Sequence, residues 1–514
     1  MIPTPGSYQP YADVRRVNFG MSFGVVAVDA ADAATASTAA AQFAASQIQQ
    51  THDRVELASA PFATLEHNIW VLDGSMSIYP EDLAGIQTGY LSEEMSNDEG
   101  ILTGQPTITF DFSTPQDSYG LTFRFDDQIP YIWPSKIKVA FFDSSGSQLF
   151  SDEYDITSTY VWVESLVQNY SRITVTFLST AVPHRRARLI ELIFGIVTRY
   201  DRKSIVSTSD QQSIDLLSES LSSAQLTVTI DNSEKLYNLV NPTGIYEYLQ
   251  NGQYVNYWYT IGGQTVNAGI RYFYAAESDD SGLTASITFN DRMILLDDVV
   301  FNGGSSGTWT LQEAITAILT AAEIKTAPTF ENNLESVIIR KCIPKETSAR
   351  EAIRMCAQAA MCTCYVDPND SLHFIRPVLK EIPDDQLTRD RLAEEPTVNI
   401  GDRYNAVTIK RNDSYVEDTE EESYTLSAAE EGDMVITKEV SNDLVNDMQE
   451  WARWALPWIQ RRTSFDIEYR GNPAIEMGDT MQVYDAFNVN GMALVESHDL
   501  EFNGGLSGSM TARR

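Results

Sequence analysis

Short segments of alternating apolar and polar residues recur through the first 200 residues, and turn-forming sequences separate them. The clearest are TITFDF (107–112), LTFRF (121–125), KIKVAFF (136–142) and ITVTFL (173–178). A period of two places every second side chain on one face of a strand. Short strands at this spacing, with turns such as DSSG between them, predict an antiparallel β-sandwich over residues 59–200. An N-terminal strand and an alanine-rich segment, residues 1–58, precede it.

The pattern changes twice after residue 200. Residues 201–300 again show strand-like alternation, for example in QLTVTI and ASITF. Residues 301–380 then contain two helical segments, and each opens on a capping box: Thr310 with Glu313, and Ser348 with Glu351. The strands CTCYVD and SLHFIRP close this part, which predicts a small α/β module. Strand signals return over residues 381–514, interrupted by an acidic segment, 414–434, that we expect to form a solvated loop.

The acidic balance of the chain excludes several classes of partner. Its 514 residues contain 36 lysines and arginines against 72 aspartates and glutamates, a formal net charge of −36. Such a field repels phosphate backbones and anionic membranes, so sequence-specific nucleic-acid binding is not expected. It suits a protein past which DNA moves without being held. The length exceeds what one hydrophobic core supports, so several domains are expected.

Neither a secretory signal nor a membrane span is predicted. The first residues, MIPTPGSYQPYADVRR, contain three prolines and no apolar core. The alanine-rich stretch 30–45 is interrupted by Asp32 and Gln42, and is therefore too polar to cross a bilayer. We expect synthesis in the host cytoplasm without a signal peptide.

The four cysteines lie close together in the sequence, but their spacing is not that of a zinc site. Between Cys342, Cys356, Cys362 and Cys364 there is no CxxC pair, and His373 is the one histidine nearby. Cys356 also falls on the apolar stripe of the second predicted helix. Buried free thiols are the prediction, and a metal at this cluster is the alternative that the sequence leaves open. No cofactor or metal is predicted.

Two segments resemble catalytic sites superficially. In ATLEHNIWVLDGS (63–75), Glu66, His67 and Asp73 have acid–base side chains, but no nucleophile or second base accompanies them. We interpret them as strand and turn residues. The sequence 303–307 fits G-x-S-x-G, yet the predicted helix begins only at Thr310, whereas a nucleophile elbow needs a helix directly after the serine. No catalytic residue is therefore predicted, and the chain is not expected to be an enzyme.

Two groups of side chains are candidates for binding. Arg185, Arg186 and Arg188 open a basic strip in an otherwise acidic chain. We expect these arginines to meet carboxylates in the same chain or in a neighbouring copy, and a polyanion site is the alternative. The aromatic candidates for stacking on a sugar are Trp133, Tyr160 and Trp162. The same residue types also form cores and interfaces, which is the other interpretation.

The order of these pieces resembles a family of tail proteins from phages and prophages of Gram-positive bacteria. In that family a segment of the form ATLE-N-x-x-LDGS introduces a β-sandwich, and a P-x-R-R-A-R-I strand ends it. This chain has Ala63–Glu66, Asn68 and Leu72–Ser75, then Pro183 and Arg185–Leu189. We expect Glu66 and Asp73 to bind backbone donors or the basic strip, because carboxylates are the natural partners of arginines in an acidic chain.

From about residue 200 to its end the chain is similar to tail hub, or tail-associated, proteins. The segments that carry this similarity are LYNLVNPTGIYEYL, RYFYAAESDDSGLTASITFNDRMILLDD, SAREAI and MGDTMQVYD with GGLSGSMTARR. The resemblance implies a mainly β (α+β) fold, with two β-barrel-like hub domains at 201–300 and 381–514 around the α/β module. It also implies a homotrimeric ring under the tail tube.

The predicted function is that of a structural virion protein. The hub would form a ring at the distal end of the tail tube in the tail or baseplate. Its expected partners are the distal tail or tail tube protein, the tape measure protein, and tip or fibre proteins. Contractile, non-contractile and bacteriocin-type tails remain open. A carbohydrate-binding adhesin is the alternative function, and a cell-wall hydrolase is a third.

Overall fold

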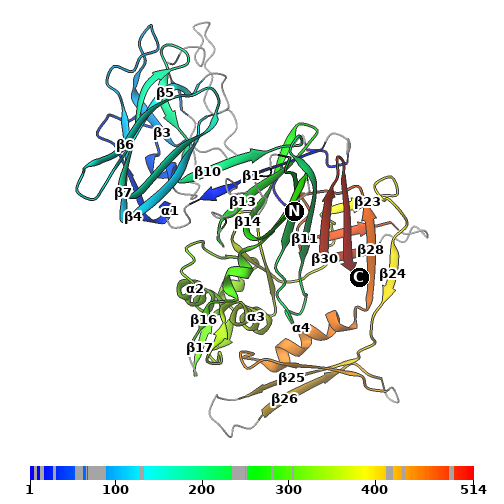
Figure 1. The fold of residues 1–514 in the computed structure, drawn as a ribbon. Coiled ribbons are helices and arrows are strands. Elements are labelled where there is room, and N and C mark those ends of the chain that lie inside the picture. The colour runs from blue at the N-terminus through cyan, green and yellow to red at the C-terminus, as the bar shows by residue number, and fades with distance from the viewer. Residues whose placement is uncertain are drawn as a thin grey trace. The chain divides into compact units, whose positions relative to one another are not determined.

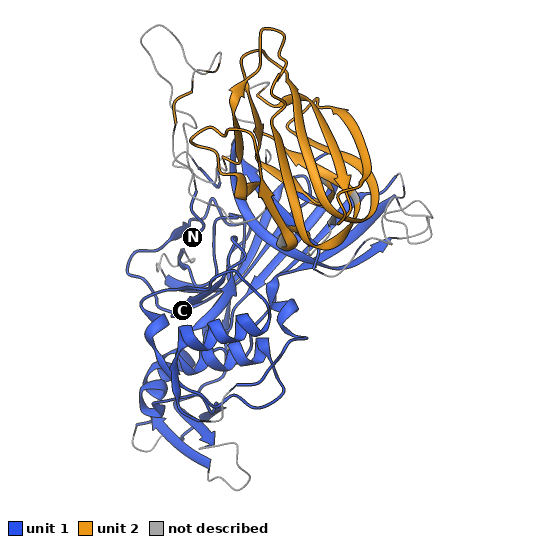
Figure 2. Cartoon of the chain, turned by 90° about the vertical axis from the view of Figure 1, so that its left-hand side faces the viewer, with its two compact units in different colours: residues 1–22, 199–514 blue, residues 23–198 orange. Residues whose placement is uncertain are grey.

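A computed structural model describes most of the chain. The described residues are 1–4, 8–11, 17–26, 30–52, 62–64, 66, 88–126, 132–233, 235, 249, 252–278, 283–303, 306–412, 421–430, 434–484 and 491–514. They form two compact units (Figure 2). Residues 23–198 make up the first, called the sandwich unit here. Residues 1–22 and 199–514 make up the second, the large unit.

The sandwich unit contains two sheets (Figure 1), and aromatic side chains pack in its core. The larger sheet has the order β2-β4-β7-β5-β6, and β9 also pairs with β4. The smaller pairs β3 with β8. Their bounds are β2 Ala34–Ser37, β3 Tyr90–Met95, β4 Thr107–Arg124, β5 Pro134–Phe142, β6 Gln148–Asp155, β7 Tyr160–Thr180, β8 Arg186–Leu189 and β9 Glu191–Ile193. Tyr90 of the small sheet stacks on Phe177 of the large one at 5.8 Å between ring centroids.

The alternating sequence explains which face of each strand is buried. In β4, Ile108 and Phe110 are buried, and in β7 so are Ile173 and Val175, while the residues between them are more exposed. Short elements precede these strands: helix α1 (Ala30–Ala33) and the 3₁₀ turn η2 (Ile48–Thr51). Because β2 pairs with β4, the sandwich unit begins before residue 59, the start predicted from the sequence.

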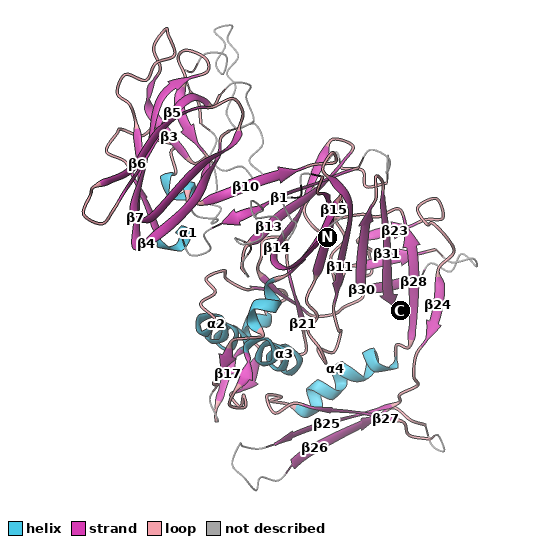
Figure 3. Cartoon of the chain, in the orientation of Figure 1, coloured by secondary structure: helices cyan, strands magenta, loops and turns pink. Residues whose placement is uncertain are grey.

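A 13-stranded sheet is the main feature of the large unit (Figure 3). Its path runs β10-β1-β13-β14-β15-β12-β11-β30-β31-β28-β24, and β29 and β23 branch from β30. The bounds are β1 Asn18–Val26, β10 Gly195–Tyr200, β11 Ile205–Ser213, β12 Gln225–Asp231, β13 Tyr254–Ile261, β14 Gln264–Ser278, β15 Thr284–Asn290, β23 Asp385–Leu387, β24 Thr397–Ile400, β28 Thr463–Tyr469, β29 Thr480–Val483, β30 Gly491–Phe502 and β31 Leu506–Arg513. Strands from both predicted hub ranges therefore belong to one sheet, because β11 pairs with β30.

The α/β module has the two predicted helices, α2 (Leu311–Ala321) and α3 (Ala349–Ala359). Thr310 and Glu313 form a complete capping box, and Ser348 accepts a hydrogen bond from the backbone of Glu351, so both predicted helix starts are confirmed. The module's other elements are β16 (Val300–Phe301), β17 (Thr308–Thr310), β18 (Thr329–Phe330), β19 (Ile338–Arg340), β20 (Thr347–Ser348), β21 (Thr363–Val366), β22 (Leu372–Ile375), η4 (Arg292–Leu296) and η5 (Leu334–Ser336).

A fourth helix, α4 (Met448–Gln460), packs against a small sheet made of β25 (Ala406–Asn412), β26 (Glu421–Ser427) and β27 (Thr437–Ser441). Trp451 of α4 is 1% exposed and donates a hydrogen bond of 2.9 Å from Nε1 to the carbonyl of Gln358 at the end of α3. This bond and the shared core fix α4 against the α/β module.

The predicted fold class is confirmed: the chain is mainly β, with antiparallel sheets and few helices. The predicted acidic loop was wrong in part, because residues 421–427 form β26 and pair with β25. In that pairing Glu422 forms an ion pair with Arg411 at 2.7 Å, which keeps an acidic segment extended. No helix among the described residues is both long and apolar enough to cross a membrane.

Candidate functional site

Glu66 is the centre of a buried charge cluster in the sandwich unit. One carboxylate oxygen lies 2.5 Å from the Arg188 guanidinium and also accepts the Thr64 hydroxyl at 2.9 Å. Its other oxygen accepts the backbone N–H of Arg186 at 2.9 Å. Glu66 has no exposed surface, and Arg188 is 2% exposed. A carboxylate with its acceptors occupied in this way is a structural anchor, as the sequence predicted for Glu66.

Strands β3 and β8 place the arginines. Leu91 pairs with Arg188 and Met95 with Arg186, and because the two arginines are two residues apart in β8 they lie on the same face of the smaller sheet. Arg188 also approaches the buried Asp126 at 3.5 Å. Asp126 was not identified from the sequence. It directly follows the segment LTFRF at the end of β4. A carboxylate directly after a strand with buried residues is the sequence signal that could have identified it.

Arg186 is fixed by the backbone of β3 and by an aromatic ring. Its Nη1 donates to the carbonyls of Ser92, at 3.0 Å, and Glu93. The guanidinium carbon lies 4.1 Å from the centroid of the Phe43 ring, in a cation–π contact. The side chain is 6% exposed. The first part of the predicted basic strip is thus buried inside the sandwich unit, and two of its three arginines are bound there.

Arg185 differs from its two neighbours. It is 2% exposed, but its Nε and Nη1 have no hydrogen-bond partner among the described residues. Burial lowers the pKa of Arg185; Glu66 opposes this and Arg188 adds to it. His67 and Asp73, the other acid–base candidates of the opening motif, lie outside the described residues.

The three aromatic candidates do not share one environment. Trp133 is half-buried and packs against the core of the sandwich unit. Tyr160 and Trp162 lie on the opposite face of β7 from the buried Val163, and Trp162 is 48% exposed. The aromatic side chains thus divide between the core and the outer face. Sugar binding by these residues remains a prediction.

The cysteines and the G-x-S-x-G sequence lie in the large unit. All four thiols are buried, and burial raises the pKa of Cys362 to about 12. Within the part of the chain that the structure describes, no group of three or more His, Cys, Asp and Glu side chains is arranged to hold a metal ion. Ser305 lies outside the described residues, and α2 begins at Leu311, after the short strand β17.

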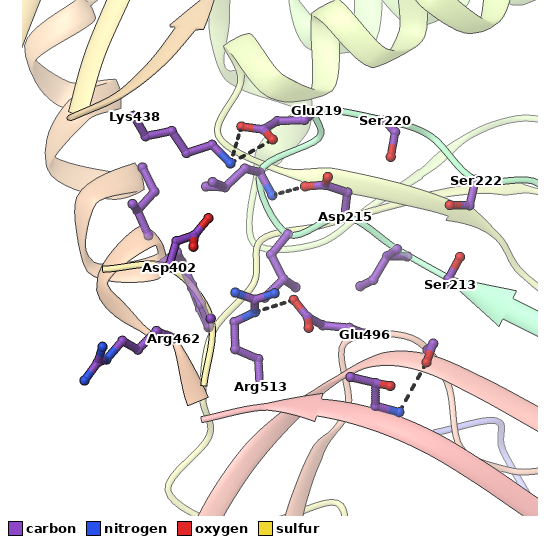
Figure 4. A pocket seen from close by; sticks show the side chains of 18 of the residues that line it. Ser213, Asp215, Glu219, Ser220, Ser222, Asp402, Lys438, Arg462, Glu496 and Arg513 are labelled. Atoms are coloured by element: carbon purple, nitrogen blue, oxygen red, sulfur yellow. Dashed lines mark hydrogen bonds and ion pairs between the residues drawn. The ribbon is translucent and has the colours of Figure 1, made fainter. Parts of the chain in front are cut away.

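A cavity of about 530 Å³ lies in the large unit, beside α4, the middle of β30 and the end of β31 (Figure 4). Two ion pairs lie in its wall: Lys438 with Glu219 at 2.9 Å, and Arg513 with Glu496 at 2.6 Å. Burial raises the pKa of Glu496, and Arg513 opposes this. The residues that line the cavity include no histidine or cysteine. The cavity is therefore polar, and the charges named in its wall are paired. No pattern in the sequence predicted it.

Comparison with known proteins gave matches to solved structures alone. No family model matches the sequence, and no curated protein does either. A tail protein from Neisseria meningitidis MC58 is 10% identical with a TM-score of 0.46, over 62% of this chain and 94% of that one. The 43 kDa tail protein of prophage MuSo2 from Shewanella oneidensis is 13% identical with a TM-score of 0.45, over 62% and 96%. A fucose binding module from Streptococcus pneumoniae is 8% identical with a TM-score of 0.20, over 31% and 89%.

Proposed function

We propose that the chain is a structural protein of a phage-type tail, a hub that forms a ring at the distal end of the tail tube. One observation carries this proposal. Strands from two segments far apart in the sequence, residues 205–290 and 463–513, form one antiparallel sheet, and the α/β module lies between them in the chain. The resemblance to hub proteins implies two β domains around such a module, and in this chain the strands of both ranges join in one sheet.

The charge of the chain supports the same function. A ring around the path of DNA has to attract phosphates weakly, because a basic lining would hold the nucleic acid. The formal net charge of −36 meets this condition. The most basic segment of the sandwich unit does not offset it, because Arg186 and Arg188 are buried and bound to acceptors of the same chain.

The proposed assembly is a homotrimer that contacts the distal tail or tail tube protein, the tape measure protein, and tip or fibre proteins. Native mass spectrometry of the purified chain tests whether it forms the homotrimer. The proposal predicts a species of three chains of 57.4 kDa each. A chain that stays monomeric at all concentrations, and also within complexes isolated from assembled tails, contradicts it.

A second function is favoured by one observation, the exposure of Trp162. Large apolar rings on an outer sheet face are suited to stack on sugar rings, and Trp162 is 48% exposed on β7. In this function the sandwich unit is a carbohydrate-binding adhesin. A glycan array tests it: binding that is lost in Trp162→Ala and kept in the exposed-leucine variant Leu166→Ala supports it. An array without binding for the full chain contradicts it.

A further inference from the structure

One face of the 13-stranded sheet is polar across its neighbouring strands β15, β12, β11, β30, β31 and β28 (Figure 3). Residues paired between strands lie on the same face, so the register arranges them in rows. The first row is Thr288, Thr227, Ser209, Glu501 and Ser507; the second is Gln225, Gln211, Asp499, Ser509 and Glu468; the third is Ser213, Ser497, Thr511 and Asp466. These residues are called the polar face here.

The polar face is accessible, whereas the opposite face forms part of the core. Each of its side chains is half-buried or exposed, and the residues between them, such as Leu226, Val228 and Leu500, are buried. All six strands have a partner on both sides, so their backbone groups bond within the sheet. The face therefore presents hydroxyl, amide and carboxylate side chains to its surroundings.

The charge of the polar face has one sign. None of its residues is a lysine or an arginine, and four carry carboxylates. Among the described residues none of these four forms an ion pair, and Arg513 at the end of β31 is bound to Glu496 at 2.6 Å. Burial raises the pKa of Asp499, and the carboxylates of Asp210 and Glu501 raise it further. The carboxylates thus act on one another with no cation between them.

Other sheets of the chain carry charges of both signs in cross-strand pairs. Arg172 of β7 binds Asp111 of β4 at 2.6 Å, and Arg411 of β25 binds Glu422 of β26 at 2.7 Å. Such pairs stabilise a sheet, and the polar face does without them. A face that only meets water has no need to exclude cations, so its composition points to a polyanion nearby.

We propose that the polar face lines the passage through the proposed ring and borders the DNA that moves along it. This inference rests on the proposed function and adds which surface of the large unit faces the axis. Carboxylates repel phosphates, and the absence of lysine and arginine leaves them no cation to bind. The serine and threonine side chains are short and uncharged, so the duplex moves past without a strong contact.

Cysteine labelling of assembled tails tests where the polar face lies. Glu501→Cys places a thiol on the face, and Ser209→Cys in the same row is a second position if the first variant does not assemble. Glu381→Cys and Glu164→Cys are controls at exposed positions outside the face. The four native thiols are buried and give little background. A small maleimide should label the face and control variants, whereas a maleimide coupled to a protein wider than duplex DNA should label the controls alone.

Two results overturn the proposal and leave the hub function standing. Labelling of the face variants by the bulky reagent in assembled tails shows that the face lies outside the ring. Protection of the same variants from the small reagent shows that another protein covers the face. A chain that is absent from the tails contradicts the hub function itself, and with it this inference.

A charge reversal tests the contact with DNA. The double variant Glu468→Lys and Glu501→Lys places two cations on the face, and Glu164→Lys with Glu381→Lys makes the same change outside it. Complete phage particles with the face variant should release their DNA about threefold more slowly in low salt, and high salt should reduce the difference because phosphate contacts are salt-dependent. Release as fast as from the control particles overturns the proposal.

Discussion

The carboxylate of Glu66 lies 2.5 Å from the guanidinium of Arg188, and neither side chain has more than 2% of its surface exposed. The two residues are far apart in the sequence, one in the motif ATLE and the other in the strand RRAR. Their contact connects residue 66 to strand β8 within the sandwich unit.

Glu66→Gln is expected to destabilise the sandwich unit by about 3–5 kcal/mol, because it leaves the buried Arg188 without the carboxylate that lies 2.5 Å from it. The free energy of unfolding from urea titration measures this. Glu164→Gln, at an exposed position of β7, is the control and should change it by less than about 0.5 kcal/mol. Equal stability of Glu66→Gln and the native chain would show that the pair is not an anchor.

Trp451→Ala is expected to cost about 3–5 kcal/mol, since it removes a buried indole and its hydrogen bond to Gln358. Trp162→Ala is the matched control, because it removes the same side chain from an exposed site. Thermal unfolding of the two variants compares them. Similar melting temperatures would mean that α4 contributes little to the stability of the large unit.

The contribution of His498 to the stability of the large unit is expected to fall as the pH is lowered from about 6.5 to about 4. His498 is buried on β30 and lies 2.5 Å from the Tyr469 hydroxyl; burial lowers its pKa to about 4. Between these pH values the unfolded chain binds a proton at this histidine and the folded chain does not. The expected loss is about 3 kcal/mol.

Urea titrations at several pH values measure this slope. The variant His498→Asn should have a smaller loss over the same range, and His184→Asn, at an exposed histidine, should keep the native slope. If the free energy of unfolding of His498→Asn depends on pH as steeply as that of the native chain, groups other than His498 cause the loss.

The four thiols should resist labelling in the folded chain. Each is buried, and burial raises the pKa of Cys362 to about 12, so little thiolate is present at pH 8. A thiol-reactive dye should label the native chain slowly and all four cysteines rapidly in denaturant. Rapid labelling of one or more cysteines in the native chain would contradict their burial.

The helix starts and many of the strands could be predicted from the sequence, because local patterns specify them. The pairing between distant strands could not. Capping residues such as Thr310 and Ser348 act within one helical turn, so their effect could be predicted. The pairing of β11 with β30 joins segments nearly 300 residues apart, and no local pattern specifies it. The acidic β26 was expected to be a loop because its composition favours solvent, but its partner strand supplies Lys410 and Arg411.

The candidate site could be predicted in part for the same reason. The expectation that Glu66 meets the basic strip came from opposite charges in a chain with few cations, and it is confirmed by the contact with Arg188. The burial of all three arginines could not be predicted, because a charged residue in a strand is usually exposed. The unpaired nitrogens of Arg185 became visible only once its neighbours had been placed.

The proposed ring is tested by an image of the assembled tail particle at a resolution sufficient to place the two units relative to the tail axis. Residues 199–514 are expected to form a threefold ring around the axis at the distal end of the tube. Density for these residues in an off-axis fibre, or no density for the chain in the tail, would contradict it.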